Sequence, residues 1–298
     1  MHPKKCITPQ DCYQTAIDAL LVSGKGKRTA ETYAREVRIL SRWLGRPLTE
    51  ATEEDIRRFV LYRRNDCKLG GSSMRLLCVG LRFFFRHVIE RNWPVLDLMD
   101  ATREQKLPTV LTREEVWKII RATSEFHNRT YFQTLYTCGL RLSEGLNLTV
   151  HDIDGQRMRI HVRAGKGAKD RFVPLPKDTY ELLRRYWVTH RNPLLIFPAL
   201  GRGLRDGRTA DHPMDVNSVQ GALHRAVNRA GITHPGIHMH TLRHCYATHL
   251  LEAHANVHAI QKYLGHARLE TTLRYFHLTN LAQGDAYQLV DRLMKEAR

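Results

Sequence analysis

The second half of the chain contains cationic and nucleophilic side chains whose types suit acid–base, nucleophilic and anion-binding chemistry. The set consists of two arginines, a lysine, two histidines and a tyrosine: Arg141, Lys166, His240, Arg243, His266 and Tyr275. Arginine guanidinium groups are planar, permanently charged forks that match phosphate oxygens. A tyrosine phenol can act as a nucleophile, although its pKa of about 10 means that the site must help to remove its proton. Histidine titrates near neutral pH and can donate or accept a proton.

Each of these residues, taken alone, has an ordinary structural explanation. An arginine after a glycine is usually a surface charge, and a tyrosine with alternating neighbours is usually half-buried core. His240 and Arg243, however, lie three residues apart and would share one face of a helix. The combination of residues and their order along the chain, rather than any single residue, indicate a functional site.

Three segments resemble the tyrosine recombinase (phage integrase) family. They read GLRLSE at 139–144, GKGAKDR at 165–171 and HTLRHCYATHLLEAHANVHAIQKYLGHARLETTLRYFH at 240–277. The last segment is the most specific, because its HTLRH, ATHLL, LGH and TTLRYFH elements follow the family's spacing. The resemblance extends over nearly the whole chain, and the length is similar to that of Xer-type members. Cys138, where a threonine is frequent, and Phe276, where a small polar residue is common, depart from the pattern without removing a reacting group.

The resemblance implies a site-specific DNA recombinase or integrase that cleaves and rejoins strands through a 3′-phosphotyrosyl intermediate and a Holliday junction. It assigns Tyr275 as the nucleophile, Arg141 and Arg243 as clamps on the scissile phosphate, and Lys166 as the general acid for the leaving 5′ oxygen. It assigns proton handling and hydrogen bonding to His240 and His266. Supporting roles fall to two further residues: Glu144, which would orient the site, and His244, which would be structural. The family needs no ATP, metal or other cofactor, and the sequence contains no phosphate-binding Gly-x-x-x-x-Gly-Lys-[Ser/Thr] loop.

Two other functions fit part of the pattern. A DNA-binding protein that has kept the fold without the chemistry is one alternative, although the complete set of reactive side chains argues against it. A metal-dependent nuclease is the other, because histidines are dense at four positions: His234, His238, His240 and His244. No nearby cysteine and no carboxylate at ligand spacing completes that set, so we expect no metal.

The elements that must position these residues are mainly helical. Helical periodicity predicts four helices in the first third, over 9–23, 29–44, 52–65 and 74–90. Further helices follow from Thr112, over 128–138 and from Lys177 onward, apart from a loop at 199–213. Residues 152–155 read as a turn, and 157–162 and 171–175 read as an antiparallel pair with Lys166 near the hairpin tip. The predicted fold is mainly α with a small antiparallel β-sheet, in a two-domain tyrosine recombinase architecture.

We expect a helical core-binding, DNA-binding domain over 1–95, a linker over 96–110 and an α+β catalytic domain with a C-terminal helix over 111–298. The run Phe83–Phe85 reads as core of the first domain. The tail after Tyr275 carries an amphipathic stripe that includes Tyr287 and Leu293. By resemblance, this C-terminal helix would dock on a neighbouring subunit in a homo-tetramer on DNA, whereas the alternative is docking on its own domain.

The charge of the chain favours a polyanionic partner. The 298 residues include 47 Lys+Arg and 30 Asp+Glu, which gives a formal charge of +17. Residues 1–95 hold +8 of this excess, so both parts of the chain could contact one double-stranded DNA. An anionic membrane surface or an acidic substrate is the alternative. The candidate DNA contacts are seven cations: Lys25, Lys27, Arg28, Arg75, Arg82, Lys169 and Arg171.

Composition also limits the other partners and the compartment. No apolar run approaches the ~20 residues that cross a bilayer, and the first residues are too polar for a signal-peptide core. The six cysteines are scattered without a C-x-x-C pair and read as reduced thiols. We therefore expect a cytoplasmic protein without a membrane partner. The resemblance implies that it recognises a specific recombination site, with a second recombinase or an accessory protein as further partners.

Overall fold

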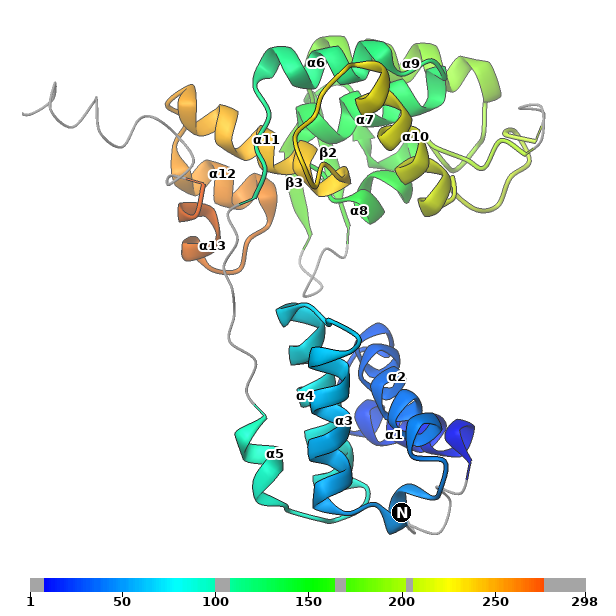
Figure 1. Cartoon of the computed structure of the whole chain (residues 1–298). Coiled ribbons are helices and arrows are strands. Elements are labelled where there is room, and N and C mark those ends of the chain that lie inside the picture. The colour runs from blue at the N-terminus through cyan, green and yellow to red at the C-terminus, as the bar shows by residue number, and fades with distance from the viewer. Residues whose placement is uncertain (1–7, 100–107, 164–169, 202–205, 276–298) are drawn as a thin grey trace, which may run out of the picture. The chain divides into compact units, whose positions relative to one another are not determined.

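The computed structural model describes residues 8–99, 108–163, 170–201 and 206–275 (Figure 1). The chain divides into two compact units, Met1–Lys106 and Leu107–Arg298. Lys166, Lys169 and the tail after Tyr275 lie outside the described residues. The observed elements are mainly helices, with one three-stranded antiparallel sheet, so the predicted fold class is confirmed.

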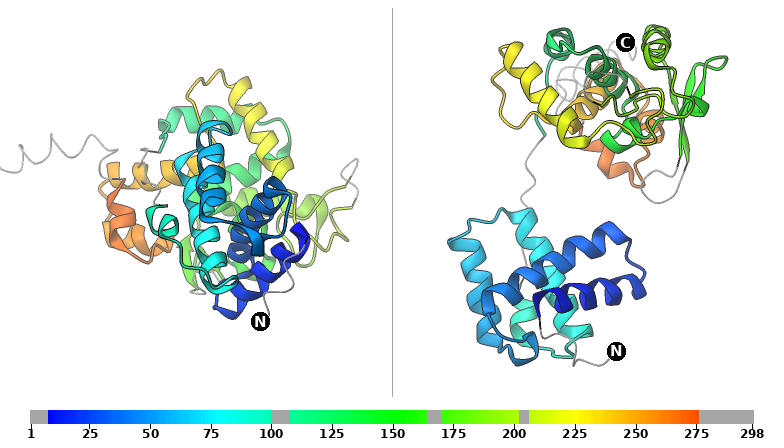
Figure 2. Two further views of the ribbon diagram at one scale, coloured as in Figure 1. Left: turned by 60° about the horizontal axis from the view of Figure 1, so that its bottom comes forward. Right: turned by 90° about the vertical axis from the view of Figure 1, so that its right-hand side faces the viewer.

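The described part of the first unit is helical. Its helices are α1 (Pro9–Val22), α2 (Lys27–Leu44), α3 (Glu53–Asn65), α4 (Gly71–His87) and α5 (Pro94–Leu98). Helices α1 and α2 pack side by side (Figure 2), and α2 also packs on α4. Gly80 permits this second approach, because a Cβ there would lie 2.8 Å from the carbonyl oxygen of Tyr33.

Two features of this unit can be compared with the sequence predictions. Phe84 and Phe85 are fully buried, so the prediction that this aromatic run forms core is confirmed for them. Helix α5 was not predicted, and it extends into the segment expected to be a linker. Leu96 and Met99 are buried in the core of the first unit, which explains why this stretch folds onto the helices.

The second unit combines helices with a small sheet. The helices are α6 (Arg113–Ala122), α7 (Phe126–Cys138), α8 (Leu142–Leu146), α9 (Lys177–His190), α10 (Val216–Arg229), α11 (Met239–Glu252), α12 (Val257–Leu264) and α13 (Leu269–Leu273). The sheet has the order β1 (Ile153–Asp154), β2 (Arg159–Val162), β3 (Arg171–Pro174). Strands β2 and β3 pair antiparallel as predicted, with His161 opposite Phe172. The prediction of a turn at 152–155 is wrong in part, because Ile153 and Asp154 pair with β2 as an edge strand.

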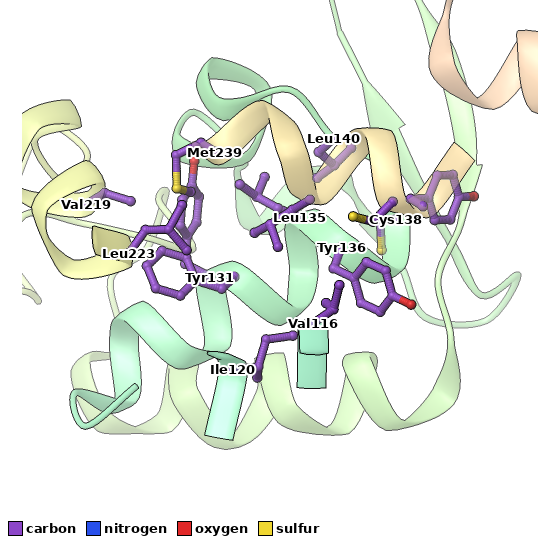
Figure 3. Close-up of a cluster of buried hydrophobic side chains, with 14 of the residues drawn as sticks. Val116, Ile120, Tyr131, Leu135, Tyr136, Cys138, Leu140, Val219, Leu223 and Met239 are labelled. Carbon is purple, nitrogen blue, oxygen red and sulfur yellow. The ribbon is translucent and has the colours of Figure 1, made fainter. Parts of the chain in front are cut away.

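Helix α11 runs through the core of this unit. Its buried side chains include Leu242, Cys245 and Ala247, all at 0% exposure. Figure 3 shows Met239 at the start of α11 in a cluster with Leu135 of α7 and Val116 of α6. A helix packed on so many sides holds its side chains, the polar ones included, in fixed positions. Within the described ranges, the helices are all too short or too polar to cross a membrane.

Candidate active site

Arg141 is positioned by the junction between α7 and α8. Gly139 ends α7 with a φ of 61°, and a Cβ there would lie 2.4 Å from the ring of Tyr246. Only glycine suits a position that has both a left-handed backbone and no room for a side chain. The chain turns there, and Arg141 becomes the residue that precedes the first turn of α8.

Glu144 holds Arg141 from the next turn. Its Oε1 lies 2.6 Å from Nη1 of Arg141, and its Oε2 accepts a 2.8 Å hydrogen bond from the Arg141 backbone N–H. Burial raises the pKa of Glu144, but hydrogen bonds from Arg171 and from the Arg141 amide outweigh it and lower that pKa to about 2. Glu144 is therefore an anion at neutral pH, which agrees with an orienting role.

Arg243 enters the same cluster from α11 and is 1% exposed. Its Nη1 donates to the carbonyl oxygen of Gly139 at 2.6 Å, and its Nη2 donates to that of Leu264. The Nη1 atom also lies 3.8 Å from Oε2 of Glu144. Burial, then the charge of Arg141, lowers the pKa of Arg243 to about 9, which still leaves it charged at neutral pH.

Arg171 lies in this cluster rather than on the surface. Its burial does not favour the predicted contact with DNA. Its side chain is 6% exposed, and its Nη1 and Nη2 donate to the two Glu144 oxygens at 2.9 and 2.7 Å. Its Nε donates to the carbonyl oxygen of Tyr263 at 2.7 Å. Arg171 therefore ties β3 to α8 and to the end of α12.

Tyr275 follows α13 and lies 4% exposed in the core of the second unit. Its hydroxyl oxygen is 2.9 Å from Nδ1 of His244. The ring of His266 stacks on it, with centroids 6.2 Å apart and planes at 14°. Burial raises the pKa of Tyr275, while the charges of Arg243 and Arg141 act in the opposite direction.

The remaining histidines of the set lie around this tyrosine. The ring of His240 meets that of His244 edge to face at 4.5 Å. Nδ1 of His266 lies 2.9 Å from Oγ1 of Thr272, a partner that the sequence patterns did not indicate. Desolvation, then the charge of Arg243, lowers the pKa of His240 to about 4 and that of His266 to about 3. Both imidazoles are therefore neutral at pH 7.

The four histidines of the metal hypothesis have other partners. Nε2 of His234 lies 3.0 Å from Oε1 of Glu115, and Nδ1 of His238 caps α11 by accepting from the N–H of Thr241. Across the part of the chain that the structure describes, no group of three or more His, Cys, Asp or Glu side chains could hold a metal ion.

Among the predicted DNA contacts outside the cluster, Lys25, Lys27, Arg28 and Arg75 are exposed on the first unit. Arg82 differs from the prediction. It is half-buried, and its guanidinium donates to the carbonyl oxygens of Leu96 and Met99 at 2.8 and 2.7 Å. These contacts hold α5 against α4 and give Arg82 a structural role.

Two family descriptions match the chain. "Phage integrase family" covers residues 109–281, and "Phage integrase, N-terminal SAM-like domain" covers residues 13–95. The tyrosine recombinase XerA of Thermococcus kodakarensis is 32% identical over 298 residues, covering 95% of this chain and 96% of the relative. An integrase/recombinase of Escherichia coli is 32% identical over 302 residues, covering 89% of each.

The fold agrees with these relatives. A lambda integrase, solved as a tetramer bound to a Holliday junction, superposes with a TM-score of 0.73 at 20% identity, covering 91% of this chain and 77% of that one. The fold and the relatives together place the chain in the class of site-specific recombinases that use a tyrosine. The chain belongs to the phage integrase family of tyrosine recombinases.

Proposed function

We propose that this recombinase cleaves and rejoins double-stranded DNA at a specific site, with Tyr275 as the nucleophile. The observation that carries the proposal is that the charges of Arg141 and Arg243 act on the buried Tyr275 phenol, whose hydroxyl lies 2.9 Å from Nδ1 of His244, the residue next to Arg243. The charges of both arginines favour the phenolate, and both guanidinium groups are held by the same carboxylate, Glu144. The relatives at 32% identity are named as recombinases, which supports the same reaction.

In this proposal the two arginines hold the nonbridging oxygens of the scissile phosphate. The phenol oxygen of Tyr275 attacks phosphorus, and the bond to the 5′ oxygen breaks. Lys166, outside the described residues, supplies a proton to that leaving oxygen, while His240 and His266 donate hydrogen bonds. The phosphotyrosyl bond keeps the energy of the phosphodiester, so rejoining requires no ATP. Fixed cations in a largely buried site stabilise the transition state more than solvated ones would.

We infer that DNA is held by both units, with residues 1–95 as the core-binding domain and 111–298 as the catalytic domain. The exposed cations of the first unit suit phosphate contacts, namely Lys25, Lys27, Arg28 and Arg75. Lys169 is a further proposed contact outside the described residues. Assembly as a tetramer on DNA is supported by the lambda integrase tetramer, and the apolar stripe that includes Tyr287 and Leu293 is the proposed link between subunits. The cytoplasm is the proposed compartment.

The test is the formation of a covalent protein–DNA adduct. Duplexes selected by the protein from a randomised library supply the site, and a nicked version of that site traps the adduct. We expect the adduct in the presence of EDTA for the wild type and for Tyr136→Phe, a matched buried tyrosine, and none for Tyr275→Phe. An undiminished adduct in Tyr275→Phe would refute the assignment, and cleavage that EDTA abolishes would favour a metal-dependent nuclease.

A further inference from the structure

The hydroxyl of the proposed nucleophile is bonded to a histidine that sequence reasoning treated as structural. Nδ1 of His244 lies 2.9 Å from the Tyr275 oxygen. His244 belongs to α11, whose neighbouring residues Arg243 and Cys245 are 1% and 0% exposed. The imidazole is therefore attached to a rigid part of the core, while Tyr275 reaches it from the segment after α13.

The two other nearby histidines are placed for other work. His266 stacks its ring face on Tyr275, and its Nδ1 is occupied by the hydroxyl of Thr272. His240 contacts the ring of His244 rather than the phenol. Of these three imidazoles, His244 is the one that the described structure places within hydrogen-bonding distance of the Tyr275 oxygen.

The charge state of His244 suits an acceptor. Burial, and then the positive field of its neighbours, lowers the pKa of His244 to about 3, so the ring is neutral at pH 7. The cationic or titratable groups that face it come from α11, its N-cap and the loop after α12: His238, His240, Arg243 and His266. A neutral ring whose Nδ1 accepts from Tyr275 carries its own proton on Nε2. A bound phosphodiester brings a negative charge that offsets the positive charge of the arginines. This charge raises the pKa of His244 in the complex with DNA, where the proton is transferred.

We propose that His244 is a catalytic residue that takes the phenolic proton of Tyr275 as the oxygen attacks phosphorus. This inference rests on the proposed role of Tyr275. As the O–P bond forms, the O–H proton moves to Nδ1 of His244, the P–O5′ bond breaks, and the 5′ oxygen is protonated by the proposed acid Lys166. On rejoining, the 5′ hydroxyl gives its proton back to the proposed Lys166 amine as its oxygen attacks phosphorus. The bond between phosphorus and the Tyr275 oxygen breaks, and the His244 imidazolium returns its proton to the departing phenolate.

The experiment compares two variants of the full chain on the nicked duplex selected above, in single-turnover cleavage. His244→Phe removes the acceptor. His244→Asn keeps an acceptor oxygen at the position of Nδ1, but an amide does not take up a proton at neutral pH. We expect both variants to cleave at least about 100-fold more slowly than the wild type, since general-base catalysis contributes on that order. A histidine that only positions Tyr275 would be largely rescued by asparagine, and that result would overturn the proposal.

A second substrate separates the nucleophile's proton from the leaving group's proton. A 5′-bridging sulfur in place of the leaving oxygen departs without an acid. We expect this substrate to restore Lys166→Ala while His244→Asn remains slow. Recovery of His244→Asn to the wild-type rate would assign His244 to the leaving group instead and would refute the inference.

Two controls keep the result interpretable. Thermal melting and equilibrium binding to the same duplex show whether each variant is folded, and cleavage rates are compared at saturating protein. If Tyr275→Phe and the wild type behave alike, the proposed function fails. If the adduct depends on Tyr275 but the His244 variants react at the wild-type rate, the role of His244 alone fails.

Discussion

Helix α11 carries two histidines that form the same hydrogen bond to a buried tyrosine. Nδ1 of His249 lies 2.8 Å from the hydroxyl oxygen of Tyr136, and Nδ1 of His244 lies 2.9 Å from that of Tyr275. Both tyrosines are less than one tenth exposed, at 8% and 4%. Hydrogen-bond geometry and burial alone would not distinguish the two pairs.

Their surroundings differ in charge and in the second ring nitrogen. Nε2 of His249 lies 2.9 Å from the carbonyl oxygen of Leu111, so both nitrogens of that ring are engaged. Burial, and then the nearby Cys245, raises the pKa of Tyr136 to about 12, while the charge of Arg113 acts in the opposite direction. At Tyr275 two arginines oppose the effect of burial. We infer that α11 uses one histidine–tyrosine pair, His249 and Tyr136, as a structural tie, and that the other, His244 and Tyr275, is the proposed reactive pair, where the charges of two arginines act.

The largest expected effect comes from replacing the guanidinium fork of Arg243, next to the proposed reactive pair. Arg243→Lys keeps a cation but loses the planar fork, so we expect single-turnover cleavage to slow by about 100-fold to 1,000-fold. Arg113→Lys changes the arginine near the structural pair, whose Nη2 donates to the carbonyl oxygen of His249 at 3.2 Å, and serves as the matched control. We expect that control to stay within about twofold of the wild-type rate. Equal losses of cleavage rate in the two variants would show that both guanidinium groups act through the stability of the fold alone.

Glu144→Gln tests the carboxylate that organises the reactive pair. The pKa of Glu144 is about 2 in the folded chain, below its ordinary value of 4.5, so its ionisation stabilises the fold above about pH 4.5. That contribution, roughly 3 kcal/mol in order of magnitude, is lost as pH falls towards 2. We expect the wild type to lose melting temperature over this range faster than Glu144→Gln does, in parallel melting curves. Parallel profiles for both proteins would contradict the role given to Glu144.

The sequence predicted the elements better than the contacts. The helices expected over 52–65 and from Thr112 and the antiparallel hairpin arise from local patterns, and the structure confirms them. The ion pair between Glu144 and Arg171 joins residues 27 positions apart, which no periodicity encodes. The sequence did carry part of the signal for the burial of Arg171. This residue lies two positions before buried Val173 on β3 and therefore shares its inward face. The contact of His244 depends on how the segment after α12 returns to α11, which is a property of tertiary packing.

The smallest expected effect concerns the structural pair. Tyr136→Phe removes one buried hydrogen bond and leaves Nδ1 of His249 without its partner, so we expect the free energy of unfolding to fall by about 1 kcal/mol. Urea denaturation of the full chain measures this loss. Because Tyr136 has no arginine pair comparable to that of Tyr275, the cleavage rate of the folded fraction should not change. A slower rate would mean that α11 couples its two pairs, and the separation between a structural and a reactive end of the helix would no longer hold.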